Sequence, residues 1–242
     1  MPPKKINKVA NTDGSKIINF YEHLPAHLLR KPENPNFALH HLEIPLRMCI
    51  VAPSSSGKTN FLLNIITLFS KGNKGTFSDI TILTANKDEP LYNHLETLSD
   101  QIVIKEGLNN IPQLDKYDKL ENHLLVFDDL VLSKDLSVVE KYYIRARKMN
   151  VSVIFISQSY FKIPKIIRNN CSYMVLLKLS GQREVNVILS EFSLGVSKDQ
   201  LLNMYKFATN LKFSPLVIDL SASPEERFRK GFLEILNPDN YN

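Results

Sequence analysis

The chain has 242 residues, 43% of them hydrophobic and 23% charged, and its formal net charge is +5 at pH 7. This is the composition of an ordinary soluble globular protein, and the length suits one α/β domain with extensions or two small domains. No apolar run approaches the roughly 20 residues that span a bilayer, so we expect no membrane partner. No apolar segment follows the basic first residues, so we expect no secretory signal there. The mild positive charge permits nucleic-acid binding without demonstrating it.

Composition divides the chain into three predicted parts. Residues 1–42 are rich in Lys, Asn and Pro, and we interpret them as an N-terminal arm or irregular lead-in. Residues 43–220 carry alternating strand and helix signals and form the predicted core. Residues 221–242 are predicted to be a C-terminal helical tail, with a helix from Pro224 to about Leu236.

Cysteine and histidine give no signal for a metal site. Cys49 and Cys171 each lie beside an apolar run, so we expect small buried core residues in a reducing compartment. No Cys and His pair has the spacing of a zinc site. His23 and His27 are four residues apart, which would place them on one helix face, but no partner follows at a matching distance. We interpret them as surface or packing residues.

Strand and helix signals alternate through the core, which predicts an α/β fold with a mostly parallel sheet flanked by helices. In chain order the predicted elements are strand Arg47–Ala52, helix Lys58–Phe69, strand Asp79–Ala85, helix Pro90–Leu98, strand Gln101–Ile104, strand Leu124–Phe127, helix Ser137–Met149, strand Val151–Gln158, strand Tyr173–Leu177, helix Arg183–Phe192, helix Lys198–Phe207 and strand Leu216–Asp219.

The most informative motif follows the first predicted strand. Ala52–Thr59 reads Ala-Pro-Ser-Ser-Ser-Gly-Lys-Thr and leads into a helix, which is the context of a phosphate-binding P-loop. The loop N–H groups and the helix N-terminus favour a polyphosphate such as ATP, with Lys58 reaching the β- and γ-phosphates and Thr59 offering its hydroxyl to Mg²⁺. Ala52 replaces the usual first Gly, so it must avoid a φ that only Gly takes easily. The alternative is a chance Ser-rich turn. The residues expected to bind the nucleotide are Ser54, Ser55, Ser56, Gly57, Lys58 and Thr59.

Two acids follow the buried strand Leu124–Phe127 and complete a Walker B pattern. Asp128 is expected to hold Mg²⁺ through its water shell, and Asp129 to polarise the attacking water. Because adjacent strand residues point to opposite sides, Asp129 must sit where the chain turns. Two carboxylates at this place are costly without a cation or donors nearby. The alternative is an Asp pair that caps the following turn or helix.

Two further polar residues flank the strand that begins at Val151. Gln158 ends that strand and is expected to sense the γ-phosphate or orient water, the alternative being a loop residue just past a strand. Arg147 lies near the end of the preceding helix, where a cation suits the helix C-terminus. The sharper hypothesis for Arg147 is an arginine finger supplied to a neighbouring subunit's nucleotide.

These motifs resemble the FtsK–HerA superfamily of DNA-pumping ATPases, and most closely the genome-packaging ATPases of poxviruses, giant viruses and virophages. The resemblance covers roughly 45–180 and rests on the P-loop, the Walker B run, the block 146–158 and the segment 163–170 that leads to the next strand. The block 146–158, with Ala-Arg, a buried strand and a terminal Gln, is the more specific match. Two residues depart from the family pattern: Ala52 replaces the first P-loop Gly, and Asp129 stands where cellular members tend to have Glu.

The resemblance implies the ASCE, RecA-like P-loop NTPase fold and a homo-oligomeric ring that hydrolyses ATP with Mg²⁺ to move double-stranded DNA into a capsid. The implied partners are double-stranded DNA, capsid or packaging-vertex proteins and further copies of the chain. The implied location is the host cell cytoplasm at the viral assembly site, or the virion. Under this hypothesis the catalytic residues are Lys58, Asp129, Arg147 (in trans) and Gln158, and the metal-binding residues are Thr59 and Asp128.

A translocase touches DNA phosphates mainly through mobile basic or polar loops. The candidates in this chain are Asn86, Lys87, Lys134, Lys162, Lys165, Arg168 and the N-terminal Lys4, Lys5 and Lys8. For each of them a solvated surface position is the alternative.

Two other functions fit part of the pattern. A P-loop kinase of a nucleotide or small metabolite needs a mobile lid with arginines and an acceptor pocket, and the segment 162–168 is the candidate for such a lid. A nucleotide-dependent assembly module without motor activity would keep Lys58 and Thr59 but would not need Asp129 or Arg147. Acceptor-dependent ADP formation without a response to duplex DNA would indicate the kinase. Whether Asp129→Asn or Arg147→Ala changes turnover or only assembly would separate the motor from the module.

Overall fold

The computed structural model describes residues 17–25, 32–72, 74–130 and 135–242. The chain divides into two compact units, Met1–Lys31 and Pro32–Asn242. The described part of the first unit holds a short 3-10 helix, Phe20–His23, whose first turn is capped by the Asn19 side chain. The predicted partner of His23, His27, lies outside the described residues.

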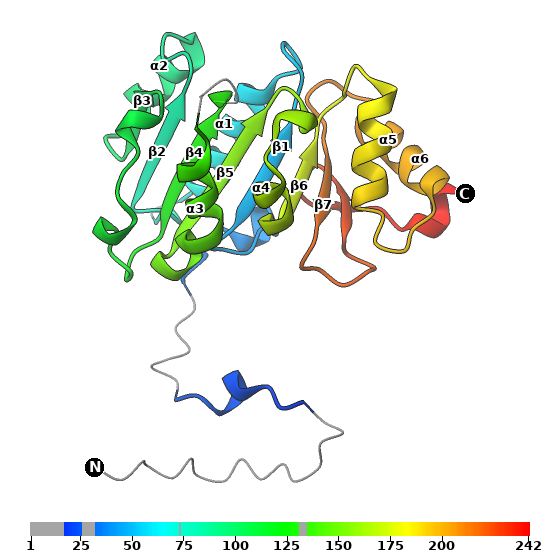
Figure 1. Cartoon of the computed structure of the whole chain (residues 1–242), viewed down its shortest axis with the longest axis horizontal. Coiled ribbons are helices and arrows are strands. Elements are labelled where there is room, and N and C mark those ends of the chain that lie inside the picture. Colours follow the sequence, from blue (N-terminus) through cyan, green and yellow to red (C-terminus); the bar gives the residue numbers. More distant parts are fainter. Residues whose placement is uncertain (1–16, 26–31, 73, 131–134) are drawn as a thin grey trace. The chain divides into compact units, whose positions relative to one another are not determined.

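The second unit is built on one mixed sheet of nine strands within the described residues (Figure 1). Their order across the sheet is β3-β2-β4-β5-β1-β6-β7-β8-β9. The strands are β1 (Arg47–Val51), β2 (Asp79–Thr84), β3 (Ile102–Glu106), β4 (His123–Asp128), β5 (Val151–Ser157), β6 (Tyr173–Leu176), β7 (Leu216–Asp219), β8 (Phe228–Lys230) and β9 (Glu234–Ile235). Strands β1 to β6 pair in parallel, whereas β7, β8 and β9 are antiparallel additions at one edge. The predicted α/β class with a mostly parallel sheet is confirmed.

Helices cover both faces of this sheet, because successive residues of its buried strands point to opposite sides. In β5, Ile154 and Ile156 pack toward α1 and α2, while Val153 and Phe155 pack toward the other helices. Figure 1 shows α3 and α4 in front of the strands. The helices are α1 (Lys58–Phe69), α2 (Pro90–Leu98), α3 (Ser137–Arg145), α4 (Lys165–Asn170), α5 (Gln182–Glu191) and α6 (Lys198–Ala208). Among the described residues no helix is both long enough and apolar enough to cross a bilayer.

The strand order brings three motif-bearing strands together. β5 lies between β1, which leads into the P-loop, and β4, which ends in the Walker B acids. Because all three run parallel, their carboxyl ends meet at one edge of the sheet. The P-loop, Asp129 and Gln158 therefore emerge side by side.

Two predicted helices need correction. The helix expected over Ser137–Met149 ends at Arg145 and continues as a 3-10 turn, Ala146–Met149. The helix expected from Pro224 to Leu236 is wrong, because this segment forms β8 and β9, followed by a 3-10 turn at Pro238–Tyr241. The segment after Gln158, from which we expected mobile loop contacts to DNA, contains α4.

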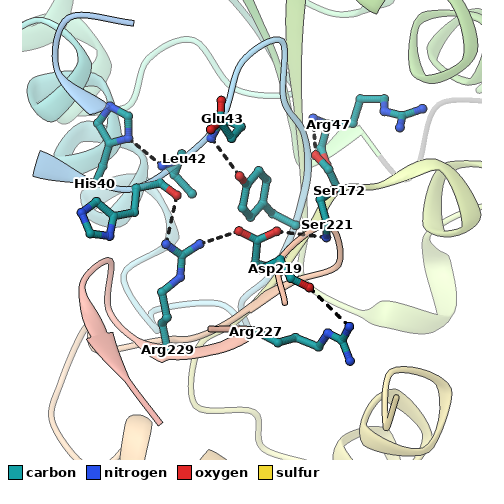
Figure 2. Close-up of polar contacts among 12 residues, drawn as sticks. His40, Leu42, Glu43, Arg47, Ser172, Asp219, Ser221, Arg227 and Arg229 are labelled. Atoms are coloured by element: carbon teal, nitrogen blue, oxygen red, sulfur yellow. Dashed lines mark hydrogen bonds and ion pairs between the residues drawn. The ribbon is translucent and has the colours of Figure 1, made fainter. Parts of the chain in front are cut away.

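Burial of Arg229 explains why the C-terminal segment is a hairpin and not a helix. Its guanidinium donates to the Asp219 carboxylate at 2.9 Å and to the His41 carbonyl at 3.0 Å (Figure 2). Phe228 beside it is also buried and packs on the sheet. Strand pairing with β7 puts both side chains in these sites, so tertiary contacts override the helical propensity of Glu225 and Glu226.

Candidate active site

The P-loop is a tight turn with left-handed backbone at Ser55 (φ 61°) and Gly57 (φ 93°). It is closed by Pro53, whose carbonyl accepts bonds from the Ser56 N–H at 3.1 Å and the Ser56 hydroxyl at 2.7 Å. Within the part of the chain that the structure describes, no side chain caps α1, which leaves N–H groups of its first turn to bind an anion. Ala52 is buried and is not among the residues with positive φ, so the missing first Gly requires no strained backbone.

Asp128 ends β4 as a buried carboxylate, and the hydroxyls of Tyr92 and, at 3.5 Å, Thr84 donate to its Oδ2. Its side chain accepts a hydrogen bond of 2.7 Å from the hydroxyl of Tyr92 in α2, and the residue is 2% exposed. Among the described residues, Oδ1 of Asp128 has no hydrogen-bond partner. Burial raises the pKa of Asp128 above its usual value, against the lowering effects of Tyr92 and of the Lys58 charge, while Asp129 adds to the rise.

This arrangement fits a divalent cation. A buried carboxylate oxygen without a donor, close to a second acid, is costly to keep charged unless a cation neutralises it. Thr59 is buried at the start of α1, and its side chain faces the same Tyr92 hydroxyl. Carboxylate and hydroxyl oxygens together with substrate phosphates are the ligands that Mg²⁺ prefers.

Asp129 and Gln158, predicted separately from two strands, are in direct contact. The side-chain amide of Gln158 donates a hydrogen bond to the carboxylate of Asp129. Asp129 has φ 55°, a left-handed conformation that turns its side chain away from the strand direction of Asp128. The Asp129 N–H bonds the Ile156 carbonyl at 3.1 Å, which fixes this turn against β5. The predicted position of Asp129 at the strand end is confirmed.

The loop after Gln158 is itself anchored. Glu184 of α5 accepts hydrogen bonds from the Ser159 hydroxyl at 2.8 Å and from the Tyr160 N–H at 2.6 Å. Ser157, buried at the end of β5, donates to the Ser159 carbonyl at 2.7 Å. These contacts hold the amide of Gln158 in place beside Asp129.

Arg147 lies at the opposite edge of the sheet from the P-loop. The 3-10 turn that contains it precedes the amino end of β5, while the P-loop follows the carboxyl end of the parallel strand β1. The seven residues of β5 separate these edges, and at about 3.3 Å per residue this corresponds to about 20 Å. Arg147 is exposed. The pKa of Arg47 is lowered mainly by the burial of Arg47 itself, and the positive charge of Arg147 is the second cause. The side chain of Arg147 does not reach the P-loop of its own chain.

The candidate DNA contacts fall into three groups. Lys162 and Lys165 are exposed just past the carboxyl end of β5, on the P-loop edge of the sheet. Lys87 pairs with Glu96 at 3.4 Å, whereas Arg168 is held in α4 by Glu191 at 2.7 Å and by the Tyr160 ring. Arg168 is thus not on the mobile loop that we expected. Lys134 and the N-terminal Lys4, Lys5 and Lys8 lie outside the described residues.

Sequence reasoning missed Tyr92. It occupies a buried position of α2 together with Leu95, at the spacing of an ordinary core stripe. The hydroxyl of Tyr92 is the signal that sequence reasoning could have used, because a buried Tyr needs a hydrogen-bond partner and the carboxylate at the end of β4 supplies one.

Comparison with known proteins places the chain in a family. Residues 36–223 match the family described as poxvirus A32 protein. The chain belongs to this family. The DNA packaging protein OPG160 of monkeypox virus is 27% identical over 201 residues, which cover 78% of this chain and 67% of the relative. The protein of the same name from vaccinia virus (strain Copenhagen) is also 27% identical over 201 residues, covering 78% and 74%.

Solved structures agree with this assignment at the level of the fold. The genome packaging NTPase B204 of Sulfolobus turreted icosahedral virus 2, in complex with ATPγS, is 13% identical with a TM-score of 0.52 and covers 77% of this chain and 97% of its own. The cytoplasmic domain of the type VII secretion ATPase EccC of Thermomonospora curvata has a TM-score of 0.53 at 15% identity, covering 78% and 25%. The chain therefore has the fold of P-loop ATPases, and the predicted resemblance to poxvirus packaging ATPases is confirmed.

Proposed function

We propose that this chain is the ATPase subunit of a viral DNA-packaging motor, which hydrolyses ATP with Mg²⁺ to translocate double-stranded DNA into a capsid. The observation that carries the proposal is the meeting of the P-loop, Asp128 and the hydrogen-bonded pair Asp129 and Gln158 at one edge of the sheet. Membership of the poxvirus A32 family and relatives named as DNA packaging proteins support the choice of DNA as the substrate that is moved.

In the proposed reaction the P-loop N–H groups and the α1 N-terminus hold the phosphates of ATP, and Lys58 lies against the β- and γ-phosphates. Thr59 and Asp128 would hold Mg²⁺, which when bound neutralises charge on the phosphates. Asp129 orients the attacking water and takes its proton as the oxygen bonds to the γ-phosphorus and the bond to the ADP oxygen breaks. Gln158 keeps the Asp129 carboxylate aimed at that water.

Arg147 is proposed to act on the nucleotide of a neighbouring chain. Its exposed position at the edge opposite the P-loop excludes the site of its own chain. In a ring with head-to-tail contacts, that edge of one subunit can face the P-loop edge of the next. The guanidinium would then stabilise negative charge that develops on the transferred phosphoryl group.

The two alternative functions are less well supported. The segment 162–168, the kinase lid of the alternative hypothesis, is fixed by α4 and by the ion pair of Arg168 with Glu191. An assembly module has no use for the left-handed Asp129, whose backbone conformation costs about 1–3 kcal/mol and is typical of functional sites.

The proposed function is tested by ATP turnover of the purified chain with and without duplex DNA. We expect turnover that rises with duplex DNA and is lost in Lys58→Ala, while the mass of the assembly shows more than one copy. Acceptor-dependent ADP formation that ignores duplex DNA would support the kinase instead. Loss of assembly in Lys58→Ala with no turnover in the wild type would support the assembly module.

A further inference from the structure

A cavity of about 470 Å³ adjoins the P-loop. Pro53 and the three following serines form one wall, and the loop after β6, which includes Lys178 and Ser180, forms another. The third wall is the loop Thr209–Ser214 between α6 and β7, here called the 209–214 loop. The volume lies within the range of sites for small molecules, about 300–1,000 Å³.

Phe213 joins this cavity to the P-loop. A Cβ built on Gly57 would lie 2.1 Å from Cδ1 of Phe213, so the edge of the ring rests directly on the backbone of Gly57. A glycine is therefore required at position 57 for two reasons. Its φ of 93° favours glycine, and the ring of Phe213 occupies the space that a Cβ would need. Phe213 itself has φ 68°, an uncommon conformation for an aromatic residue, which argues that its placement serves a purpose.

The ring of Phe213 is accessible although it touches the P-loop. The residue is 41% exposed, and the ammonium of Lys212 lies 4.9 Å from the ring centre. Lys212 is exposed and on a flexible stem, so a flat ligand can replace it over the ring while the ammonium stays near a phosphate or ribose. An exposed aromatic face beside a phosphate cradle suits a heterocyclic base.

From this arrangement we infer that the cavity holds the nucleoside part of the bound nucleotide and that Phe213 stacks on its base. The inference rests on the proposed function for the phosphate site alone, because the P-loop serines that line the cavity fix where the phosphates end and the nucleoside begins. The 209–214 loop thereby completes the nucleotide site from the antiparallel side of the sheet.

The polar lining of the cavity indicates weak discrimination between bases. Lys178, Asn210 and Lys212 are exposed, and the buried hydroxyl of Thr209 already donates to the Tyr205 carbonyl at 2.8 Å. A site that reads base edges needs fixed polar groups, whereas stacking accepts any base. GTP is therefore expected to bind within about tenfold of ATP.

The test is calorimetric titration of the full chain with ATP and with inorganic tripolyphosphate, each with Mg²⁺. Phe213→Ala is expected to weaken the affinity for ATP by about tenfold or more and to leave the affinity for tripolyphosphate within about twofold of the wild-type value. Phe213→Tyr, which keeps the ring, and Leu120→Ala, which removes an exposed apolar side chain outside the cavity, are expected to bind ATP as the wild type does. The inference is overturned if Phe213→Ala binds ATP normally, or if its affinities for ATP and for tripolyphosphate fall by the same factor.

A second measurement needs no variant. Photolabelling of the wild-type chain with 8-azido-ATP is expected to modify the peptide that contains the 209–214 loop, and modification confined to other peptides would contradict the inference. Lys58→Ala separates this question from the proposed function. If Lys58→Ala binds tripolyphosphate normally, the phosphate site is wrong. If it loses tripolyphosphate, only the Phe213 results decide the nucleoside site.

Discussion

The hydroxyl of Tyr92 donates a hydrogen bond of 2.7 Å to the buried carboxylate of Asp128. This contact leaves the other carboxylate oxygen of Asp128 without a partner among the described residues. Tyr92 thereby fixes the rotation of the carboxylate and directs its free oxygen toward the place where a cation would bind. Groups that orient metal ligands in this way commonly set the affinity for the metal.

We expect Tyr92→Phe to lower the apparent affinity for Mg²⁺ in ATP hydrolysis by about 10–100-fold, because the Asp128 carboxylate loses the hydroxyl donor that orients it. The measurement is the Mg²⁺ concentration at half-maximal turnover, and excess EDTA should abolish turnover in both proteins. Tyr173→Phe is the matched control, since its hydroxyl accepts a bond from the Glu43 N–H near the amino edge of the sheet. Equal shifts in both variants, or none in Tyr92→Phe, would argue against this role.

Asp129→Asn should lower the turnover of ATP by at least about 100-fold, because an amide cannot take the proton of the attacking water. Asn tolerates the left-handed backbone of Asp129, so the fold should persist. Gln158→Ala should also slow turnover, since the carboxylate loses its orienting donor. Both variants should bind ATP with nearly normal affinity. Turnover of Asp129→Asn within a few-fold of wild type would show that another group activates the water.

Subunit mixing tests whether Arg147 acts across an interface. Arg147→Ala and Lys58→Ala should each be inactive alone, for different reasons. In an equimolar mixture of the two, about one interface in four pairs an intact P-loop with an intact Arg147, so about a quarter of wild-type turnover should return. Arg145→Ala, also exposed and two residues away, should keep its activity. A mixture as inactive as its components would speak against a finger in trans.

Removing one partner of the buried pair Arg229 and Asp219 should lower the free energy of unfolding. Both side chains are nearly inaccessible, so Asp219→Ala leaves an uncompensated guanidinium at a cost of about 3–5 kcal/mol. Urea denaturation measures the change. Glu234→Ala removes the half-exposed partner of Lys230 and should cost less than about 1 kcal/mol. Similar losses in the two variants would mean that the buried pair does not anchor the hairpin (Figure 2).

The parallel core was predictable because its signals are local. Continuous apolar runs such as the one before Asp128 require a strand buried on both faces, and a strand, a Gly-Lys-Thr turn and a helix in succession identify the P-loop. Parallel pairing then forces the carboxyl ends of the strands to one edge, which is why Asp129 and Gln158 could be assigned to one site before their contact was known.

The remaining features depend on contacts between residues distant in sequence. The hairpin of β8 and β9 forms because Arg229 donates hydrogen bonds to Asp219 and to the His41 carbonyl. Both partners lie outside the segment 224–236, so its sequence alone does not indicate these contacts. Tyr92 resembles a core residue until its hydroxyl is seen beside Asp128. Phe213 lies in a short loop with no motif, and only the fold brings it to Gly57.

The central claim, that hydrolysis at this site moves duplex DNA, is tested most directly by displacement of a triplex-forming strand from a linear duplex. We expect the wild-type chain to release the third strand when ATP and Mg²⁺ are present. A non-hydrolysable ATP analogue should give no release, and neither should Asp129→Asn. Steady ATP turnover without strand release, or release that does not require ATP hydrolysis, would contradict the proposed motor.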